Sequence, residues 1–405
     1  MDPAGQTLFP ADEAQLAEAV AAAVAGETPV AVAGGGTRSG LGRPVEAEAL
    51  IDTRGMSGVL FYEPGELVLS ARAGTPLSEI VAMLDAEGQE LACEPMDFAA
   101  LSGLDPAEAS GTLGGMVAAG VAGSRRIRAG AVRDHVLGFR CVTGRAEPIK
   151  SGGRVMKNVT GYDLSKLVTA SHGTLCVLTE VTVKVLPKPE TQATLVLHGL
   201  DDAAAVAALT KASGTPHEGS SFAHLPEGTS PDGIARTAIR LEGPEVSVSA
   251  RVADMIRDVA GSAETSTLDA GASATFWNDL RDGLPVVAGE GQVWRISVAP
   301  TAGPRVMTEV RAAGVPVLAH AYDWAGGLIW LRVEAAGGAH ADAIRAAVAA
   351  AGGGHATLFR AADEVRRTVP VFQPQSPALA ALTARVKHAF DPARVLNRGR
   401  MREDL

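Results

Sequence analysis

The segment AVAGGGTRSGLG, residues 31–42, constrains the fold of this chain more than any other feature of the sequence. Three consecutive glycines follow an apolar run with the character of a short strand, and Thr-Arg-Ser separates them from a further glycine. Because glycine has no Cβ, its backbone can turn sharply or approach another group closely. The segment therefore predicts a tight loop after a buried strand, with amides and hydroxyls that a ligand could reach.

Two common nucleotide-binding motifs do not match this loop. A Walker A loop requires a lysine near its end, and no lysine lies between Gly34 and Gly40. A dinucleotide-binding fingerprint requires a third glycine where Ser39 stands. A run of unobstructed amides still forms a nest for an anion. A phosphate site and a purely structural turn therefore both remain open at this point.

A second small-residue segment, ASGTLGGMVAAG, covers residues 109–120 and carries hydroxyl donors at Ser110 and Thr112. Two such segments in one chain suggest a single extended ligand that crosses both. The alternative is a pair of closely packed turns between strands and helices.

Composition excludes several classes of protein. The net charge is −10 and no long basic stripe is present, which argues against nucleic acid as the main partner. The odd number and wide spacing of Cys93, Cys141 and Cys176 match neither a disulfide framework nor a zinc site, and favour a reduced protein. The first residues lack the basic and apolar regions of a signal peptide, and no apolar run approaches the ~20 residues of a membrane span. We expect a cytoplasmic protein, with any peripheral association at the inner membrane made through partner subunits.

The length of 405 residues favours two domains. The apolar run TLCVLTEVTVKVLPKPE reads as a long strand that ends at prolines 187 and 189, where a boundary is predicted. Beyond it, strand and helix patterns alternate. This order predicts two βαβ-like halves on an antiparallel sheet of four to six strands.

Further motifs follow the two glycine-rich segments in a fixed order. They include GGMVAAGVAGSRRIRAGAVRDHVLGFR, GGRVMKNVTGYDLSKL and the closing FDPARVLNRGRM. The set resembles the FAD-binding domain of the vanillyl-alcohol oxidase type (PCMH-type), and in particular the FAD-binding subunits of glycolate oxidases. The closing motif departs from the family pattern F-D-P-x-x-x-L-N-P-G-R because Arg398 replaces the second proline. The resemblance covers about residues 27–190 and 385–401.

The resemblance implies an α+β fold in three segments. Residues 1–189 would form the PCMH-type FAD-binding domain, built of two α/β subdomains. Residues 190–370 would form a smaller α+β cap, and residues 371–405 would return to the FAD domain.

The resemblance also implies an FAD site. The pyrophosphate would lie on the first glycine loop, at Gly34, Gly35, Gly36, Thr37, Arg38, Ser39 and Gly40. The flavin and ribityl side would be lined by Pro95, Ser110, Thr112, Gly114, Gly115 and Ala118. The backbone of Val177, Leu178 and Thr179 would face the adenine end or the flavin, and Asn397 would close over the isoalloxazine.

Two departures from related flavoproteins refine this expectation. Many relatives tether the flavin to a histidine in or near the first loop, where this chain has Arg38 and Ser39, and all nine histidines lie from His135 onward. We therefore expect noncovalent FAD. Catalytic relatives carry a histidine-rich metal motif for the substrate carboxylate, and no such motif is present, so neither a metal site nor catalytic residues are assigned.

The implied function is that of the FAD-binding subunit of a glycolate oxidase (glycolate dehydrogenase) complex. The complex would oxidise glycolate to glyoxylate and pass electrons through flavin to an iron-sulfur partner. Its expected partners are a catalytic flavin subunit and an iron-sulfur subunit, because this chain has no cysteine cluster for iron-sulfur centres. The alternatives are a stand-alone FAD-dependent 2-hydroxy acid dehydrogenase of the D-lactate type and a non-catalytic scaffold subunit.

A few other residues carry separate expectations. His172 is expected as a structural cap or a neighbour of the flavin, and His217 and His224 are expected in a surface loop. Residues 320–327 are expected in the core or at a domain edge, with a flavin-facing position as the alternative. The basic run at residues 123–128 is expected as a solvated loop, with a partner or flavin contact as the alternative. A buried network at the start of a helix, with Asp163 capping or pairing, is expected for Lys157, Asn158, Tyr162 and Asp163. The alternative is that Lys157 or Asn158 lies near the flavin or the subunit contact.

Overall fold

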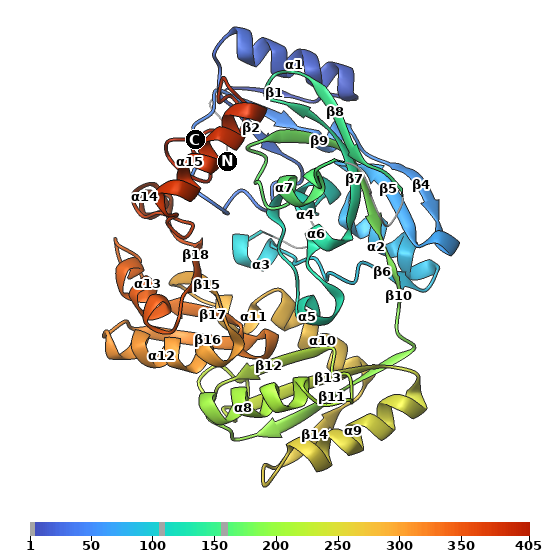
Figure 1. Cartoon of the computed structure of the whole chain (residues 1–405), viewed down its shortest axis with the longest axis vertical. Helices are drawn as coiled ribbons and strands as arrows, with labels where there is room; N and C mark the ends of the chain where they lie inside the picture. Colours follow the sequence, from blue (N-terminus) through green and yellow to red (C-terminus); the bar gives the residue numbers. More distant parts are fainter. Residues whose placement is uncertain (1–4, 105–109, 155–160) are drawn as a thin grey trace. The chain divides into compact units, whose positions relative to one another are not determined.

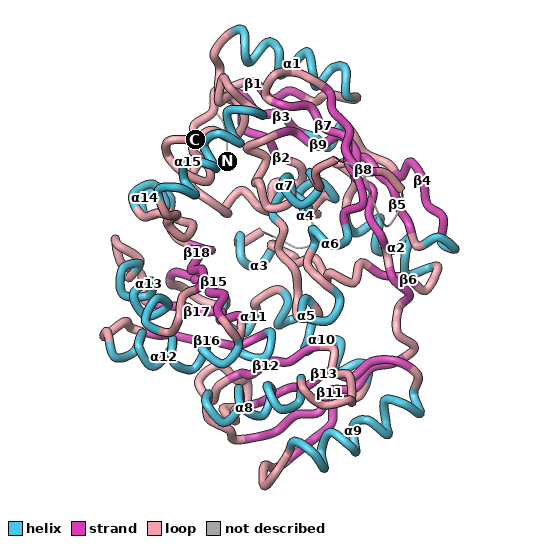
Figure 2. Tube along the Cα trace, viewed as in Figure 1, coloured by secondary structure: helices cyan, strands magenta, loops and turns pink. Residues whose placement is uncertain are grey.

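The computed structural model describes residues 5–104, 110–154 and 161–405, and its chain divides into two compact units (Figures 1 and 2). The first unit comprises residues 1–121, 130–188 and 374–405, and the second comprises residues 122–129 and 189–373. The division after Lys188 falls at the proline-rich stretch. Residues 122–129, which the sequence placed in the first domain, belong to the second unit.

A small parallel sheet in the first unit carries the first glycine-rich loop. Its strands are β1 (Gln6–Leu8), β3 (Ala49–Asp52) and β2 (Val30–Ala33), in the order β1-β3-β2. Helix α1 (Glu13–Ala25) begins at Asp12, whose side chain accepts a hydrogen bond from the Gln15 amide, and packs its buried residues against β2 and β3. Because β2 and β3 are parallel, the loops that follow them start from the same edge of the sheet.

A five-stranded antiparallel sheet forms the rest of the first unit. Its strand order is β4-β5-β9-β7-β8. The strands are β4 (Val59–Glu63), β5 (Val68–Arg72), β7 (Val136–Thr143), β8 (Pro148–Gly152) and β9 (Cys176–Lys184), and β6 (Gln89–Glu90) pairs separately with β10 (Leu186–Pro187). The helices are α2 (Leu77–Ala86), α3 (Ala99–Ser102), α4 (Leu113–Ala119), α6 (Val132–His135), α7 (Leu164–Val168) and α15 (Pro377–Phe390). Helix α4, which begins in the second glycine-rich segment, contacts β5 and β9.

The second unit is one antiparallel sheet of eight strands built from two repeats of the order βαββαβ. The first repeat is β11 (Thr191–His198), α8 (Asp202–Ser213), β12 (Ser221–Leu225), β13 (Arg236–Gly243), α9 (Glu245–Val259) and β14 (Thr265–Leu268). The second is β15 (Gln292–Val298), α12 (Gly303–Ala312), β16 (Val317–Asp323), β17 (Leu328–Val333), α13 (Ala341–Ala350) and β18 (Gly354–Arg360). Shorter helices are α5 (Arg126–Ala129), α10 (Ala270–Arg281), α11 (Leu284–Val287) and α14 (Asp363–Thr368). The sequence prediction of four to six strands was too low, because each repeat adds four strands and β12 pairs with β16 to join them.

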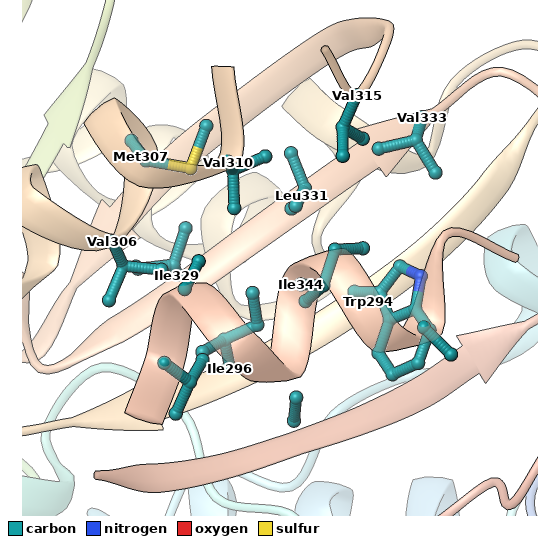
Figure 3. Packing of buried hydrophobic residues seen from close by; sticks show 14 of the residues in the cluster. Trp294, Ile296, Val306, Met307, Val310, Val315, Ile329, Leu331, Val333 and Ile344 are labelled. Atoms are coloured by element: carbon teal, nitrogen blue, oxygen red, sulfur yellow. The ribbon is translucent and has the colours of Figure 1, made fainter. Parts of the chain in front are cut away.

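The core of the second repeat lies between its sheet and helices α12 and α13 (Figure 3). Trp294 and Ile296 point from β15 into this core, where they meet Val306 on α12 and Ile344 on α13. Because side chains alternate along a strand, the residue between them, Arg295, belongs to the opposite face of the sheet.

The structure tests several of the sequence-based expectations for individual residues. His224 lies fully buried in β12, so its expected place in a surface loop was wrong. Residues 320–327 are buried, as the core expectation required. Asp163 caps α7 by accepting a hydrogen bond from the Lys166 amide, but Tyr162 is 90% exposed rather than part of a buried network. Lys157 and Asn158 lie outside the described residues.

Candidate cofactor-binding site

A cavity in the first unit opens where the parallel sheet, α4, the start of β9 and the C-terminal segment meet. It contains about 1290 Å³ of space not occupied by atoms, part of it open to solvent. The cavity is lined by these residues of the expected FAD site: Gly34, Gly35, Gly36, Thr37, Arg38, Ser39, Thr112, Gly114, Gly115, Ala118, Val177, Leu178 and Asn397.

The glycines of the first loop serve two different purposes. A Cβ on Gly34 would overlap the side chain of Thr112, and a Cβ on Gly35 would overlap the carbonyl oxygen of Ser110. These two glycines thus let the two glycine-rich segments pack closely, Gly34 against the Thr112 side chain and Gly35 against the Ser110 backbone. Gly36 has a φ of +72° and nothing within 4 Å of a Cβ position, so its backbone faces open space.

Arg38 brings a partly buried positive charge to the cavity wall. Its Nη1 donates to Thr37 Oγ1 at 3.2 Å, its Nη2 donates to the Met96 carbonyl at 3.4 Å, and its guanidinium lies 4.8 Å from the Phe98 ring centroid. The Arg38 Nε is buried and has no hydrogen-bond partner in the described part of the chain. Burial lowers the pKa of Arg38 to about 10, so the side chain is still charged at neutral pH. A partly buried cation with a buried, unused donor fits an anionic ligand.

Asn397 joins two walls of the cavity. Its Oδ1 accepts a hydrogen bond from the Val32 amide at 2.9 Å, and its Nδ2 donates to the His172 carbonyl at 2.8 Å. Its own amide donates to the Val30 carbonyl at 3.0 Å. Both ends of the Asn397 side chain are thus engaged with the protein, and the residue holds β2 to the loop that precedes β9.

A buried ion pair fixes the C-terminal segment that carries Asn397. The Lys387 Nζ donates to Asp391 Oδ2 at 2.7 Å, to the Thr174 carbonyl at 2.7 Å and to the Leu396 carbonyl at 3.1 Å. Asp391 also accepts from the amides of Val395 and Leu396. All three ammonium hydrogens of Lys387 are therefore used, which ties α15, the start of β9 and the C-terminal segment together.

Four residues of the expected site do not line the cavity. They are Gly40, Pro95, Ser110 and Thr179. The cavity reaches only the first residues of β9, and Thr179 lies beyond them. Thr179 instead donates its hydroxyl hydrogen to Glu13 Oε2 at 2.9 Å and so holds β9 to α1. Ser110 contributes its backbone to the packing against Gly35.

Sequence reasoning missed other residues on the wall. They are Val32, Ala33, Leu50, Asp52, Thr53, Arg54, Ala73, Ala119, Ser171, Gly173, Cys176 and Arg400. Asp52, Thr53 and Arg54 could have been found, since they end the strand beside β2 and ligands bind at the carboxyl ends of neighbouring parallel strands. The others come together only through tertiary contacts.

His172 lies on the cavity wall and is held neutral. Burial, aided by the positive charge of Arg400, lowers its pKa to about 3. His172 therefore adds no charge to the cavity at neutral pH, in keeping with a packing or cofactor-neighbouring position.

The described residues contain no candidate metal site and no candidate membrane-spanning helix. Within residues 5–104, 110–154 and 161–405, no three or more His, Cys, Asp or Glu side chains gather as a metal-binding group. None of the helices in that part of the chain is long and apolar enough to cross a membrane. Cys93, Cys141 and Cys176 are free and buried.

Comparison with known proteins identifies the family. Residues 4–152 match the family model described as an FAD-binding domain. The chain is 37% identical over 402 residues to the glycolate oxidase subunit GlcE of Escherichia coli, and the match covers 96% of this chain and 97% of that protein. The chain belongs to the GlcE family of FAD-binding proteins. Its cofactor is FAD.

The chain is also similar to two other proteins. The chain is 30% identical to the glycolate oxidase subunit GlcD of Bacillus subtilis over 163 residues, which cover 40% of this chain and 33% of that protein. A solved structure of alkyldihydroxyacetonephosphate synthase aligns with a TM-score of 0.65 at 17% identity, covering 96% of this chain and 76% of the other. The second similarity shows the fold, a PCMH-type FAD-binding domain with an additional α+β unit.

The residues on the cavity wall fit the cofactor of this family. Arg38, with its unused Nε, and the open backbone at Gly36 suit the negative charge of a pyrophosphate. Ala73, Ala118 and Ala119 leave a smooth, small-residue wall that suits a flat ring.

Proposed function

We propose that this chain is the FAD-binding subunit of a complex that oxidises glycolate to glyoxylate. The observation that carries the proposal is the similarity to GlcE over nearly the whole of both chains, combined with a cavity whose charge and shape fit FAD. FAD supplies the acceptor for two electrons and releases them onward. The similarity to GlcD supports a second flavin subunit in the same complex, and an iron-sulfur subunit would take the electrons. The complex would be cytoplasmic, with any peripheral contact with the inner membrane made by its partner subunits.

The chain's own residues would bind and orient the cofactor. Arg38 would offset the charge of the pyrophosphate, and the backbone at Gly36 would donate amide hydrogens to it. Asn397 and the Lys387–Asp391 pair would keep the C-terminal segment closed against the cavity. His172 would remain neutral beside the cofactor.

We propose that FAD is held without a covalent bond. The first loop offers Arg38 and Ser39, neither of which forms the bond to flavin that a histidine forms. His172 and Cys176 also line the cavity. Variants of these two residues therefore serve as controls for a covalent bond to the flavin. Acid precipitation of the purified chain should release all of its flavin into solution. Flavin that stays in the precipitate of the wild-type chain but not of a His172→Gln or Cys176→Ser variant would contradict this.

The experiment that tests the function is anaerobic reduction. The purified chain should carry FAD, and glycolate should bleach the visible flavin band when the partner subunits are present. D-lactate in a parallel sample tests the alternative of a D-lactate-type dehydrogenase. Bleaching by glycolate with the chain alone would show that it catalyses the oxidation itself and would exclude a scaffold role. A purified chain without any bound flavin would overturn the proposal.

A further inference from the structure

The two repeats of the second unit are joined by little backbone pairing. Strands β12 and β16 meet with the single register pair His224 and Tyr322, whereas β11 and β13 pair over eight residues. Each repeat has its own buried core, one around Leu209 and the other around Trp294. Helix α8 of the first repeat crosses the joint, because its Val206 packs with the second core. Side chains therefore carry much of the joint between the repeats.

A buried polar cluster lies at this joint, centred on Asp202, the first residue of α8. Asp202 Oδ2 accepts hydrogen bonds from the Tyr322 hydroxyl at 2.8 Å and from His320 Nε2 at 3.0 Å, both on β16. The same oxygen lies 3.5 Å from Arg311 Nη1 on α12, and Asp202 Oδ1 lies 3.5 Å from His224 Nε2 on β12. These five residues form the Asp202 cluster. In it, one carboxylate of the first repeat contacts three residues of the second.

The charges in the Asp202 cluster balance only while both histidines are neutral. Asp202 carries one negative charge and Arg311 one positive charge. His224 and His320 are 0% and 5% exposed, so water does not solvate a charge on either ring. A proton on either imidazole would leave an excess of buried positive charge, which is costly.

The other groups around the two histidines do not offset such a charge. On β13, Thr237 Oγ1 lies 3.0 Å from His224 Nδ1 and is uncharged. Thr229 Oγ1 contacts the backbone of His320 and is also uncharged. The carboxylates of Asp201 and Glu227 are exposed on the wall of the adjacent cavity, where water screens them.

The pKa shifts in the cluster follow from these contacts. Burial lowers the pKa of His320 below its usual value, Asp202 partly opposes this shift, and the positive charge of Arg311 adds to it. Arg311 Nη2 lies only 3.4 Å from His320 Nε2. Burial would raise the pKa of Asp202, but the neighbouring His224 and the hydrogen-bond partners on β16 lower it overall. Because an open joint takes up the proton of His320 more readily than the closed joint, the joint is stable at neutral pH and weakens as the pH falls below about 6.5.

We propose that the Asp202 cluster is a pH-sensitive switch that holds the two repeats together at neutral pH and releases them in acid. One proton is taken up by the His320 imidazole, which then carries a positive charge beside Arg311. The repeats separate at β12 and β16 while each keeps its own core. Asp202 and Arg311 line a cavity that is open to solvent, so protons reach the cluster in the folded chain. No residue of the cofactor cavity takes part, and the switch does not depend on the proposed function.

Tryptophan fluorescence reports on the second unit alone, because all four tryptophans, at positions 277, 294, 324 and 330, belong to it. Urea unfolding of the FAD-loaded chain is followed by this signal at about pH 7 and about pH 5. The unfolding constant of the wild type should rise in acid, by up to about tenfold per pH unit for the one proton taken up. His320→Gln keeps an amide N–H near the position of Nε2 and does not titrate, so it should remove most of this rise.

Two further variants separate titration from packing. His198→Gln is the matched control: this histidine lies on β11 of the same unit, and its Nε2 is 2.7 Å from the uncharged Ser266 hydroxyl. It should keep the pH dependence of the wild type. Tyr322→Phe removes a hydrogen bond to Asp202 but no group that titrates between pH 5 and 7. It should raise the unfolding constant at both pH values by a similar factor.

Hydrogen–deuterium exchange of the wild-type chain locates the change. After correction for the intrinsic exchange rate, the amides of β12 and β16 should lose protection at about pH 5 before those of β11 and β18. This measurement needs no variant, so it decides the question even if His320→Gln does not fold. The proposal is overturned if the unfolding constant of the wild type does not rise in acid, if His320→Gln keeps the full rise, or if all eight strands lose protection together.

Discussion

The buried pair of Lys387 and Asp391 gives the sharpest prediction about the first unit. The Lys387 and Asp391 side chains are 4% and 0% exposed, and Lys387 donates to Asp391, Thr174 and Leu396. Lys387→Met removes the only partner that neutralises Asp391 in the described contacts and frees two backbone carbonyls. We expect the C-terminal segment to loosen and the first unit to lose stability.

The magnitude follows from the burial of the pair. Removing one partner of a buried ion pair costs about 3–5 kcal/mol, because the remaining charge stays buried without compensation. For a unit of this size that corresponds to a fall of roughly 6–20 °C in the thermal midpoint. FAD should also bind more weakly, since Asn397 follows directly on Leu396 and joins two cavity walls.

The assay is urea unfolding of the FAD-free and FAD-loaded chain, read by circular dichroism and flavin fluorescence. Lys188→Met is the matched control: it removes a lysine from an ion pair with Asp85 whose side chains are 53% and 59% exposed, and should cost about 1 kcal/mol or less. In the double variant, adding Asp391→Asn should recover part of the loss from Lys387→Met. A Lys387→Met variant within about 0.5 kcal/mol of wild type, or strict additivity in the double variant, would refute the reasoning.

Three further predictions concern the cavity. Gly35→Ala should lower the free energy of unfolding by about 1–3 kcal/mol and reduce FAD retention, because its Cβ would overlap the Ser110 carbonyl oxygen. The control is Gly40→Ala, whose Cβ would meet nothing within 4 Å. Its free energy of unfolding should be close to that of wild type in the same urea assay. His172 has a folded pKa of about 3, so the unfolded state takes up the proton first and stability falls as pH drops from about 6.5 towards 3, by at most about 1.4 kcal/mol per unit. His172→Gln should flatten this part of the stability–pH curve. An unchanged curve would show that His172 does not cause this pH dependence. Arg38→Met should weaken FAD binding at least tenfold, about 1.4 kcal/mol, as measured by fluorescence titration, and FAD affinity equal to wild type would exclude Arg38 from the pyrophosphate site.

Local sequence signals accounted for much of the lining of the cavity. The glycine-rich loop after β2, the hydroxyl at Thr112 and the closing Asn397 all lie on one cavity, although they are far apart in the chain. The role of Gly34 and Gly35 was only partly visible, because both a ligand and another backbone segment can require a missing Cβ. The structure separates these uses: Gly35 meets Ser110, and Gly36 faces open space.

The sequence by itself determined the family and the FAD cofactor, because these depend on motifs that act over short stretches of chain. Tertiary structure alone decided that residues 122–129 join the second unit, that two four-stranded repeats pair into one sheet through β12 and β16, and that Asp52 reaches the cavity. It also decided that Arg295 lies over two tryptophan rings, with no hydrogen-bond partner for its Nε among the described residues. Such features depend on contacts between distant residues, and the pairing or isolation of a charge cannot be read from the residues beside it in the chain.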